Sequence, residues 1–285
     1  MRTQFGEQLR YQEVVAVGPG SLPVHRDDVK LHIRQATDVT WEDSLIDNQI
    51  REATAAVEQD SHRCLVMQTI QTYIDRFPLL SRNQAGLDLY PTNNIEIRRC
   101  PVFSVDSITY TDYNGAVQTW SLSTYAQYNT ADEPCQIRYK WGGMWPIARL
   151  QEKSICITTH NGYLVPFTAS GSTLTLNGYT PVNGDKWRVS NSGGTVPTGL
   201  SLMTDYYVIN ASGQTCQLST TAGGAAVTLS SAGTGYNFLG EINPLAFQAI
   251  LLRVGMEYVD REGAEYNRCK DGYWSKINGL KYEGP

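Results

Sequence analysis

The chain has 285 residues and a formal net charge of -5, with 41% hydrophobic and 18% charged residues. This length favours two domains over one. The mild acidity argues against a nucleic-acid-binding protein that relies on many phosphate contacts, because such binding needs a basic surface. The first fifteen residues contain no apolar stretch, so we expect no signal peptide, and no apolar run is long enough to span a bilayer.

The first part of the chain is interpreted as an arm followed by two helices. Residues 1–22 run into VGPGSLP at 17–23, a turn-rich sequence that is typical of an extended segment. A short helix is predicted over HRDDVKLHIRQ, which begins at His25. A longer helix is predicted over 41–61, where apolar residues recur at helical spacing. Thr40 and Asp43 resemble its capping box, with Asp in place of Glu.

From Cys64 onwards the pattern indicates strands. The sequence CLVMQTIQTYIDRF alternates and is rich in β-branched and aromatic residues, which is typical of a strand. Two shorter strands are predicted in NNIEIRRCPVFSVDSITYTD, broken at Pro101. Asn114 and Gly115 favour a tight hairpin turn. CQIRYKW and KSICITTH predict two more strands, with the turn GGMWP between them.

A compositional change marks residues 164–240. The charged residues of this stretch are Asp185, Lys186, Arg188 and Asp205. Strand-like runs such as STLTLNG, DKWRVSN and DYYVINA alternate with turns that contain glycine, which predicts an all-β, sandwich-like domain or a small barrel. A Ser/Thr/Gly-rich linker is the alternative, but the aromatic and β-branched residues within the runs favour a folded domain.

The last part of the chain is interpreted as a helix and a second arm. The sequence NPLAFQAILLRVGMEYVDRE predicts a helix with Asn243 as its N-cap and Pro244 at its first position. Residues 263–285 carry glycines among aromatic and basic residues, and we interpret them as an extended arm.

A search for catalytic or metal-binding motifs finds none that indicates a site. The four histidines have no metal-ligand spacing, and neither a phosphate-binding loop nor a nucleophile elbow is present. The six cysteines are far apart in sequence, which favours buried thiols over zinc ligands or disulfides. We therefore expect no enzymatic activity, no cofactor and no metal. A histidine and a cysteine brought together in space would support a hydrolase, the third of our functional hypotheses.

The many aromatic residues allow a second hypothesis. Trp187, Tyr206 or Tyr207 of the β domain could form a sugar-binding surface, making the chain a receptor- or glycan-binding protein. Packing within the strands is the simpler interpretation, because aromatic residues favour strands in any case.

Several stretches in a fixed order resemble one protein family. They are LPVHRDDVKLHIRQ, the segment from DSLIDNQIREATAAVEQ to IDRFP, IEIRRCPVFSVDSITYTDYNGAVQTW, IRYKWGGMWP, the pair Gly162–Tyr163, and NPLAFQAILLRVGMEYVDRE. Together they resemble the head–tail connector proteins of tailed bacteriophages, also called adaptor or head-completion proteins. The resemblance departs from the family at one place, because about 75 residues separate Tyr163 from Asn243 where the family has a short loop.

The resemblance implies an α+β fold, with a connector core of helices and strands that carries an inserted all-β domain. The expected parts are an N-terminal arm over 1–22, the core over 23–163 and 241–262, the inserted domain over 164–240 and a C-terminal arm over 263–285.

The resemblance also implies a structural role in the virion. The chain would be made in the host cytoplasm and form a ring of twelve copies in the neck, between the portal protein and the tail or next head-completion protein. DNA would pass through its channel without sequence-specific binding, and no membrane would be involved. The C-terminal arm would dock on the portal through these residues: Tyr273, Trp274, Lys276, Lys281 and Tyr282.

Overall fold

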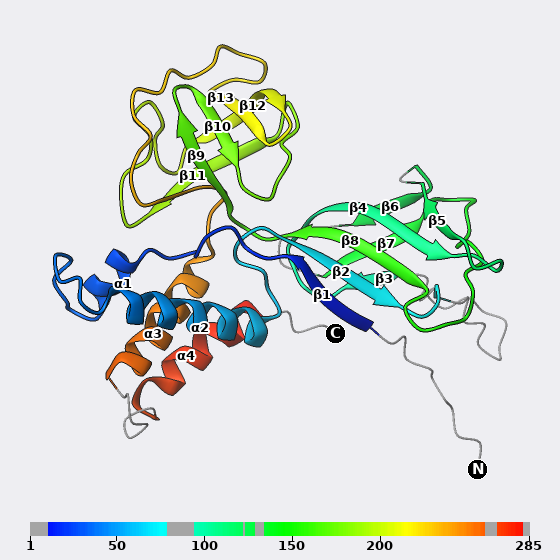
Figure 1. The fold of residues 1–285 in the computed structure, drawn as a ribbon, viewed down its shortest axis with the longest axis horizontal. Helices are drawn as coiled ribbons and strands as arrows, with labels where there is room; N and C mark the ends of the chain where they lie inside the picture. Colours follow the sequence, from blue (N-terminus) through cyan, green and yellow to red (C-terminus); the bar gives the residue numbers. More distant parts are fainter. Residues whose placement is uncertain (1–10, 79–93, 122, 129–133, 260–266, 282–285) are drawn as a thin grey trace. The chain divides into compact units, whose positions relative to one another are not determined.

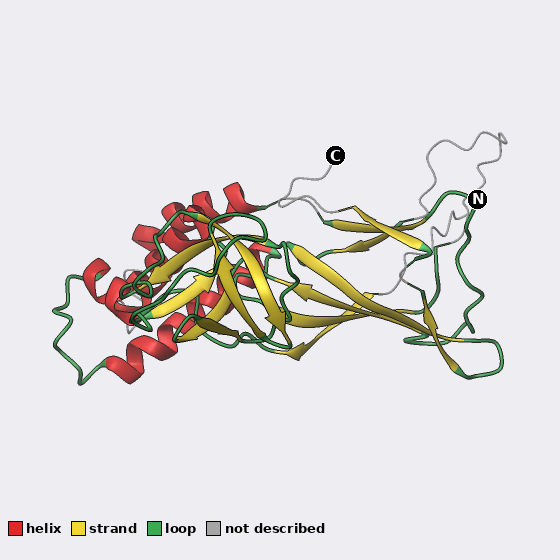
Figure 2. Cartoon of the chain, turned by 90° about the horizontal axis from the view of Figure 1, so that it is seen from above, coloured by secondary structure: helices red, strands yellow, loops and turns green. Residues whose placement is uncertain are grey.

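The computed structural model describes residues 11–78, 94–121, 123–128, 134–259 and 267–281. Within these ranges the chain has an α+β fold with four helices and fourteen strands (Figure 1). The described strands form two open sheets and one closed barrel, drawn in yellow in Figure 2 with the helices in red. The chain divides into two compact units, residues 1–18 with 69–161 and residues 19–68 with 162–285.

The first unit is a sandwich of two antiparallel sheets. Its sheets have the orders β1-β2-β8-β4-β5 and β3-β7-β6. Side chains from both sheets form one core that includes Ile74, Ile97, Ile137 and Ile157, all fully buried. The strands are β1 Tyr11–Val17, β2 Gln68–Ile74, β3 Ile95–Ile97, β4 Val102–Thr111, β5 Val117–Trp120, β6 Tyr125–Tyr128, β7 Cys135–Tyr139 and β8 Ile155–Asn161.

The predicted N-terminal arm contains a strand of this sandwich. β1 pairs with β2 in antiparallel register, with Tyr11 opposite Ile74. The valines at its C-terminal end are exposed. The segment therefore lacks the alternation of buried apolar and exposed polar residues by which a strand is predicted from sequence. Residues 1–10 lie outside the described part. The turn predicted at Asn114–Gly115 is confirmed between β4 and β5, and the break at Pro101 separates β3 from β4.

The second unit contains the helix bundle. Its helices are α1 Arg26–His32, α2 Asp43–Ser61, α3 Pro244–Val259 and α4 Asn267–Leu280. Both long helices predicted from sequence are present, but the capping box of α2 was wrong. Glu42 is the N-cap and makes no side-chain cap hydrogen bond. The Asp43 carboxylate instead pairs with Arg26 Nη1 and with the buried Lys30 Nζ, each at 2.6 Å, so it links α2 to α1.

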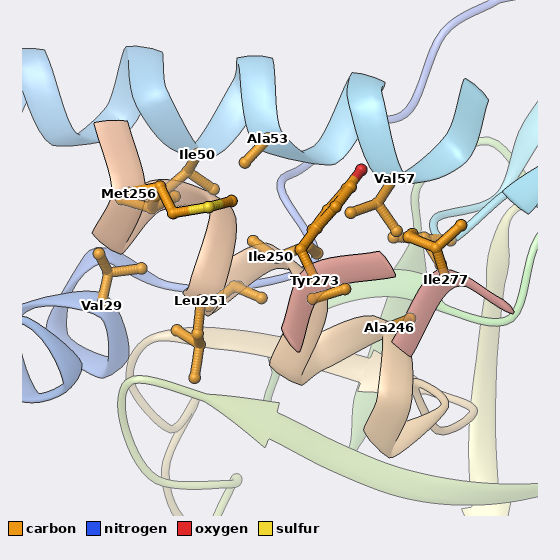
Figure 3. Packing of buried hydrophobic residues seen from close by; sticks show 14 of the residues in the cluster. Val29, Ile50, Ala53, Val57, Ala246, Ile250, Leu251, Met256, Tyr273 and Ile277 are labelled. Atoms are coloured by element: carbon orange, nitrogen blue, oxygen red, sulfur yellow. The ribbon is translucent and has the colours of Figure 1, made fainter. Parts of the chain in front are cut away.

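Helix α4 corrects the interpretation of the chain's end as an extended arm. Residues 267–280 are helical, and Tyr273, Ile277 and Leu280 are buried against α2 and α3. Figure 3 shows the Tyr273 ring near Val57 of α2 and Ile250 of α3. Its hydroxyl donates to Asp60 Oδ2 at 2.7 Å. The two glycines of α4 obscured the helix, because glycine disfavours helix interiors.

The all-β stretch is a closed six-stranded barrel rather than the sandwich we expected first. The strand order is β10-β13-β12-β11-β14-β9, and a separate apolar core fills the interior. Closure leaves no edge strand. The strands are β9 Val165–Ser170, β10 Thr173–Leu176, β11 Lys186–Ser192, β12 Asp205–Ser212, β13 Thr215–Ser219 and β14 Tyr236–Leu239.

The ends of the barrel lie side by side, which leads to a prediction about its removal. Val165 and Leu239 are partners in the β9–β14 ladder, so their Cα atoms are about 5 Å apart. We expect that replacing 165–240 with a short Gly/Ser linker leaves a soluble chain that unfolds cooperatively. Its melting temperature should fall, because the buried Val66 and Leu164 lose their contact with Phe238. An insoluble or non-cooperative product in calorimetry would contradict this independence.

Candidate assembly surface

Four of the most exposed apolar side chains of the first unit lie on one segment. We call residues 141–150, between β7 and β8, the apolar segment; it has no regular secondary structure. Four of its large side chains are strongly exposed at a spacing of three residues: Trp141 103%, Met144 79%, Ile147 81% and Leu150 76%. Trp145 and Ala148, which alternate with them, pack against the sandwich core. The inward side chains, Trp145 and Ala148, therefore pack the segment against the sandwich, and the four exposed side chains face solvent.

The inward set fixes the segment firmly. The Trp145 ring stacks on Phe77 with centroids 5.1 Å apart and lies 4.9 Å from the Trp120 ring. A turn begins the segment, where Gly143 N–H donates to Lys140 O at 2.9 Å and Gly142 has a φ of 78°. This backbone conformation disfavours residues with a Cβ. The outward side chains are thus displayed on an anchored segment.

The turn between β4 and β5 extends this surface. Arg149 N–H donates to Thr111 O at 2.8 Å, which ties the apolar segment to the start of the turn. Tyr113 and Val117 on this hairpin are 82% and 72% exposed. Exposed large apolar side chains that gather on one surface mark contacts with other proteins more often than the scattered ones of an ordinary monomer surface do. Such a surface is typical of a contact with another protein.

Asp112 organises the same hairpin. Its carboxylate accepts hydrogen bonds from Gln118 Nε2 and from the backbone N–H groups of Asn114 and Ala116, each at 2.9 Å. These bonds, the one from Gln118 foremost, lower the pKa of Asp112. The ionised carboxylate therefore stabilises the folded hairpin.

The pH dependence of this stabilisation follows from the sign of the shift. A depressed folded-state pKa contributes stability above the unfolded-state pKa, and the contribution is lost as the pH falls through the folded-state value. We expect Asp112→Ala to lower the melting temperature at neutral pH, with a difference that shrinks as the pH drops below the ordinary aspartate range. A difference in melting temperature that stays constant from neutral to acid pH would contradict this role.

The residues predicted to contact a portal are not one exposed set. Tyr273 is 1% exposed and belongs to the helix-bundle core, so it cannot reach a partner while α4 stays folded. Trp274 and Lys276 are half-buried on α4, and Lys281 follows it with its Nζ 5.4 Å from the centroid of the Trp274 ring. Tyr282 lies outside the described residues. A portal contact by Trp274, Lys276 and Lys281 stays a prediction.

Two of the three aromatic residues proposed for sugar binding, Tyr206 and Trp187, belong to the barrel's own packing. Tyr206 is 3% exposed, and its hydroxyl accepts a hydrogen bond from Ser201 N at 2.9 Å. Trp187 packs against the barrel core, with its ring 6.0 Å from that of Tyr179. Tyr207 is half-buried on β12. The positions of Tyr206 and Trp187 fit the simpler interpretation of strand packing.

One cluster that sequence reasoning missed resembles a catalytic triad in composition. Ser104 and Asp106 of β4 lie beside His160 of β8. More than fifty residues separate His160 from each of them in sequence. His160 Nδ1 is 2.8 Å from Asp106 Oδ2 and 3.4 Å from Ser104 Oγ. A working triad places the serine and the carboxylate on opposite ring nitrogens, whereas here both approach Nδ1. This geometry suits a cross-strand surface pair and not nucleophile activation.

The remaining titratable side chains of the described residues form no reactive site. No group of three or more His, Cys, Asp or Glu there could hold a metal ion. Burial raises the pKa of the Cys135 thiol to about 12 and that of Cys216 to about 11, so both stay protonated and unreactive at neutral pH. Among the described helices, none is long and apolar enough to cross a membrane.

Comparison with known proteins finds a similar fold but no family. No protein-family model matches the chain, and no curated protein matches it. Its fold is similar to that of a chain in the virion of a native gene transfer agent particle, with a TM-score of 0.53 and 14% identity. The match covers 96% of each chain. At this identity the likeness concerns the α+β fold alone.

Two matches to the necks of gene transfer agent particles are shorter, each covering 54% of this chain at 18% identity. The matched chain in the neck of the empty particle, computed with C6 symmetry, gives a TM-score of 0.39 and is covered over 71% of its length. The matched chain in the neck of the native particle, computed with C12 symmetry, gives a TM-score of 0.37 and is covered over 70%. These TM-scores are too low to carry an argument.

Proposed function

We propose that this chain is a structural protein of a phage-like virion, an adaptor that forms a ring between the portal and the tail. In this role it extends the DNA channel, completes the head and carries out no catalysis. Twelve copies form the ring in the neck, and the tail or the next head-completion protein docks on its other side. The mild acidity of the chain lets DNA pass without being held through its phosphates.

The observation that carries this proposal is the fold match over nearly the whole of both chains, to a protein of the gene transfer agent virion. The apolar segment supports it further. Trp141, Met144, Ile147 and Leu150 are costly to leave in water, and contact with a partner in an assembly would cover them. We assign this surface to contacts within the neck.

A genetic experiment tests the adaptor role. Deleting the gene from the particle's genome should yield DNA-containing heads that lack tails in electron micrographs, since no other ring would join portal and tail. Supplying the full-length chain in trans should restore tailed particles. Normal tailed particles in the deletion strain would contradict the proposal, as would a strain that fails to make heads at all.

A further inference from the structure

A cavity of about 360 Å³ lies on the barrel, in the second unit. We call it the barrel pocket. Strands β9, β10 and β14 form its floor, the β12–β13 turn adds Gln214, and residues 20 and 21 form one rim. Its volume falls within the range of small-molecule sites. None of our assigned functions uses it.

The lining has one consistent chemistry. None of the twelve lining residues is charged, and every polar side chain among them is a hydroxyl or an amide. A charged ligand would lose its hydration there without gaining a counter-charge, which is unfavourable. A purely apolar ligand would leave these polar groups without partners. The ligand that fits is uncharged and rich in hydrogen-bonding groups.

The polar groups retain unused hydrogen-bonding capacity. Among the described residues, no side-chain hydrogen bond is formed by Thr168, Thr175, Gln214 or Tyr236. Asn177 Nδ2 donates only a long bond of 3.5 Å to Gly20 O. Amides and hydroxyls both donate and accept, so these groups can pair with ligand hydroxyls in either direction.

Two aromatic residues line the pocket, Tyr236 and Phe167. Phe167 belongs to the barrel core, so Tyr236 is the ring available to a ligand. Tyr236 is half-buried, and its position is fixed by edge contacts with His25 at 4.8 Å and with Phe238 at 6.5 Å between ring centroids. A fixed ring offers an apolar surface for the C–H groups of a ligand at little entropic cost. Neutral polar groups around one ring suit a molecule with hydroxyls at its edge and C–H groups on its face.

We propose that the barrel pocket binds a neutral carbohydrate through Thr168, Thr175, Asn177, Gln214 and Tyr236. This inference goes beyond the adaptor role and does not depend on it. It also differs from the earlier hypothesis on Trp187, Tyr206 and Tyr207, because none of those three residues lines the barrel pocket. An open pocket of this size predicts weak, millimolar binding to a single sugar unit.

The test is a titration of the full-length chain, followed by ligand-observed NMR. The neutral probes are glucose, galactose, mannose and N-acetylglucosamine. Glucuronic acid and glucosamine serve as charged analogues of glucose. We expect saturable binding of at least one neutral sugar, and at least tenfold weaker binding of the charged analogues because the pocket lacks a counter-charge.

Variants locate the site. Thr175→Val removes one hydroxyl at nearly constant shape and should weaken binding about fivefold. Gln214→Ala, in an exposed turn, should also weaken it. Thr173→Val is the matched control on the same strand, outside the pocket lining, and should bind like the parent chain.

Three results would overturn the proposal: no saturable binding of any neutral sugar, equal binding of the charged analogues, or sugar binding that neither Thr175→Val nor Gln214→Ala weakens. A Ser/Thr-rich peptide that saturates the pocket when no sugar does would assign it to a protein contact instead. None of these results bears on the tailless phenotype, so the two proposals fail separately.

Discussion

Truncation after Gly263 is expected to abolish the cooperative unfolding of the helix bundle. It removes α4, whose Tyr273, Ile277 and Leu280 are at most 1% exposed. At about 2 kcal/mol for each buried side chain, the loss is roughly 6 kcal/mol, against a total stability of about 5–15 kcal/mol for a typical protein. Calorimetry of the truncated and full chains measures the difference directly.

Single substitutions show whether α4 acts through packing. Tyr273→Ala should destabilise the chain by about 3–5 kcal/mol. Tyr273→Phe, which keeps the ring and loses the bond to Asp60 Oδ2, should cost about 1 kcal/mol. Ser275→Ala is the control, since Ser275 is exposed on the same helix. A truncated chain that keeps its melting temperature but no longer binds portal would contradict this account. It would instead support the interpretation of residues 263–285 as an extended arm that binds the portal.

Substitution of an exposed residue of the apolar segment is expected to weaken partner binding without changing the stability of the fold. Trp141→Ser alters a side chain that is 103% exposed, so the melting temperature should stay unchanged. If Trp141 is a central contact of the neck, binding to the partner ring should weaken at least tenfold, as for a hot-spot residue. Sedimentation of the purified chain with portal, and with the tail protein, measures the loss.

Trp145→Ser is the matched control in the same segment. Its half-buried ring stacks on Phe77 and packs against the sandwich core. We therefore expect a lower melting temperature, because the substitution removes these aromatic contacts. If Trp141→Ser binds both partners as tightly as the parent chain, the apolar segment is not an assembly contact.

Local sequence signals predicted much of the secondary structure. The helices α2 and α3, the Asn114–Gly115 turn and the strand-rich barrel sequence all follow from periodicity, caps and turn residues. Closure of the barrel could not be predicted in the same way. It depends on β9 pairing with both β10 and β14, and β14 is some seventy residues away in sequence.

Helix α4 shows where a local signal was overlooked. Its buried residues Tyr273, Ile277 and Leu280 have helical spacing, but Gly272 and Gly279 weakened the pattern. Packing explains the second glycine, since a Cβ at Gly279 would lie 2.9 Å from Leu245 Cδ1 of α3. The glycine lets the two helices approach closely, a requirement that the isolated segment does not reveal.

The assembly surface was only partly visible in the sequence. GGMWP was predicted as a turn, and Gly142 and Gly143 do form one. The sequence does not reveal that Trp145 faces the core while Trp141 faces solvent, because the segment has neither helical nor strand periodicity. The neutral lining of the barrel pocket likewise depends on strands that meet only after the barrel closes.

Mass photometry of the full-length chain, alone and mixed with portal, tests the central claim most directly. The chain has a mass of 31.7 kDa. We predict that portal rings gain a mass equal to twelve copies of this chain, and that the gain saturates at that value. A chain that stays monomeric in both samples and adds no mass to the portal would contradict an adaptor ring.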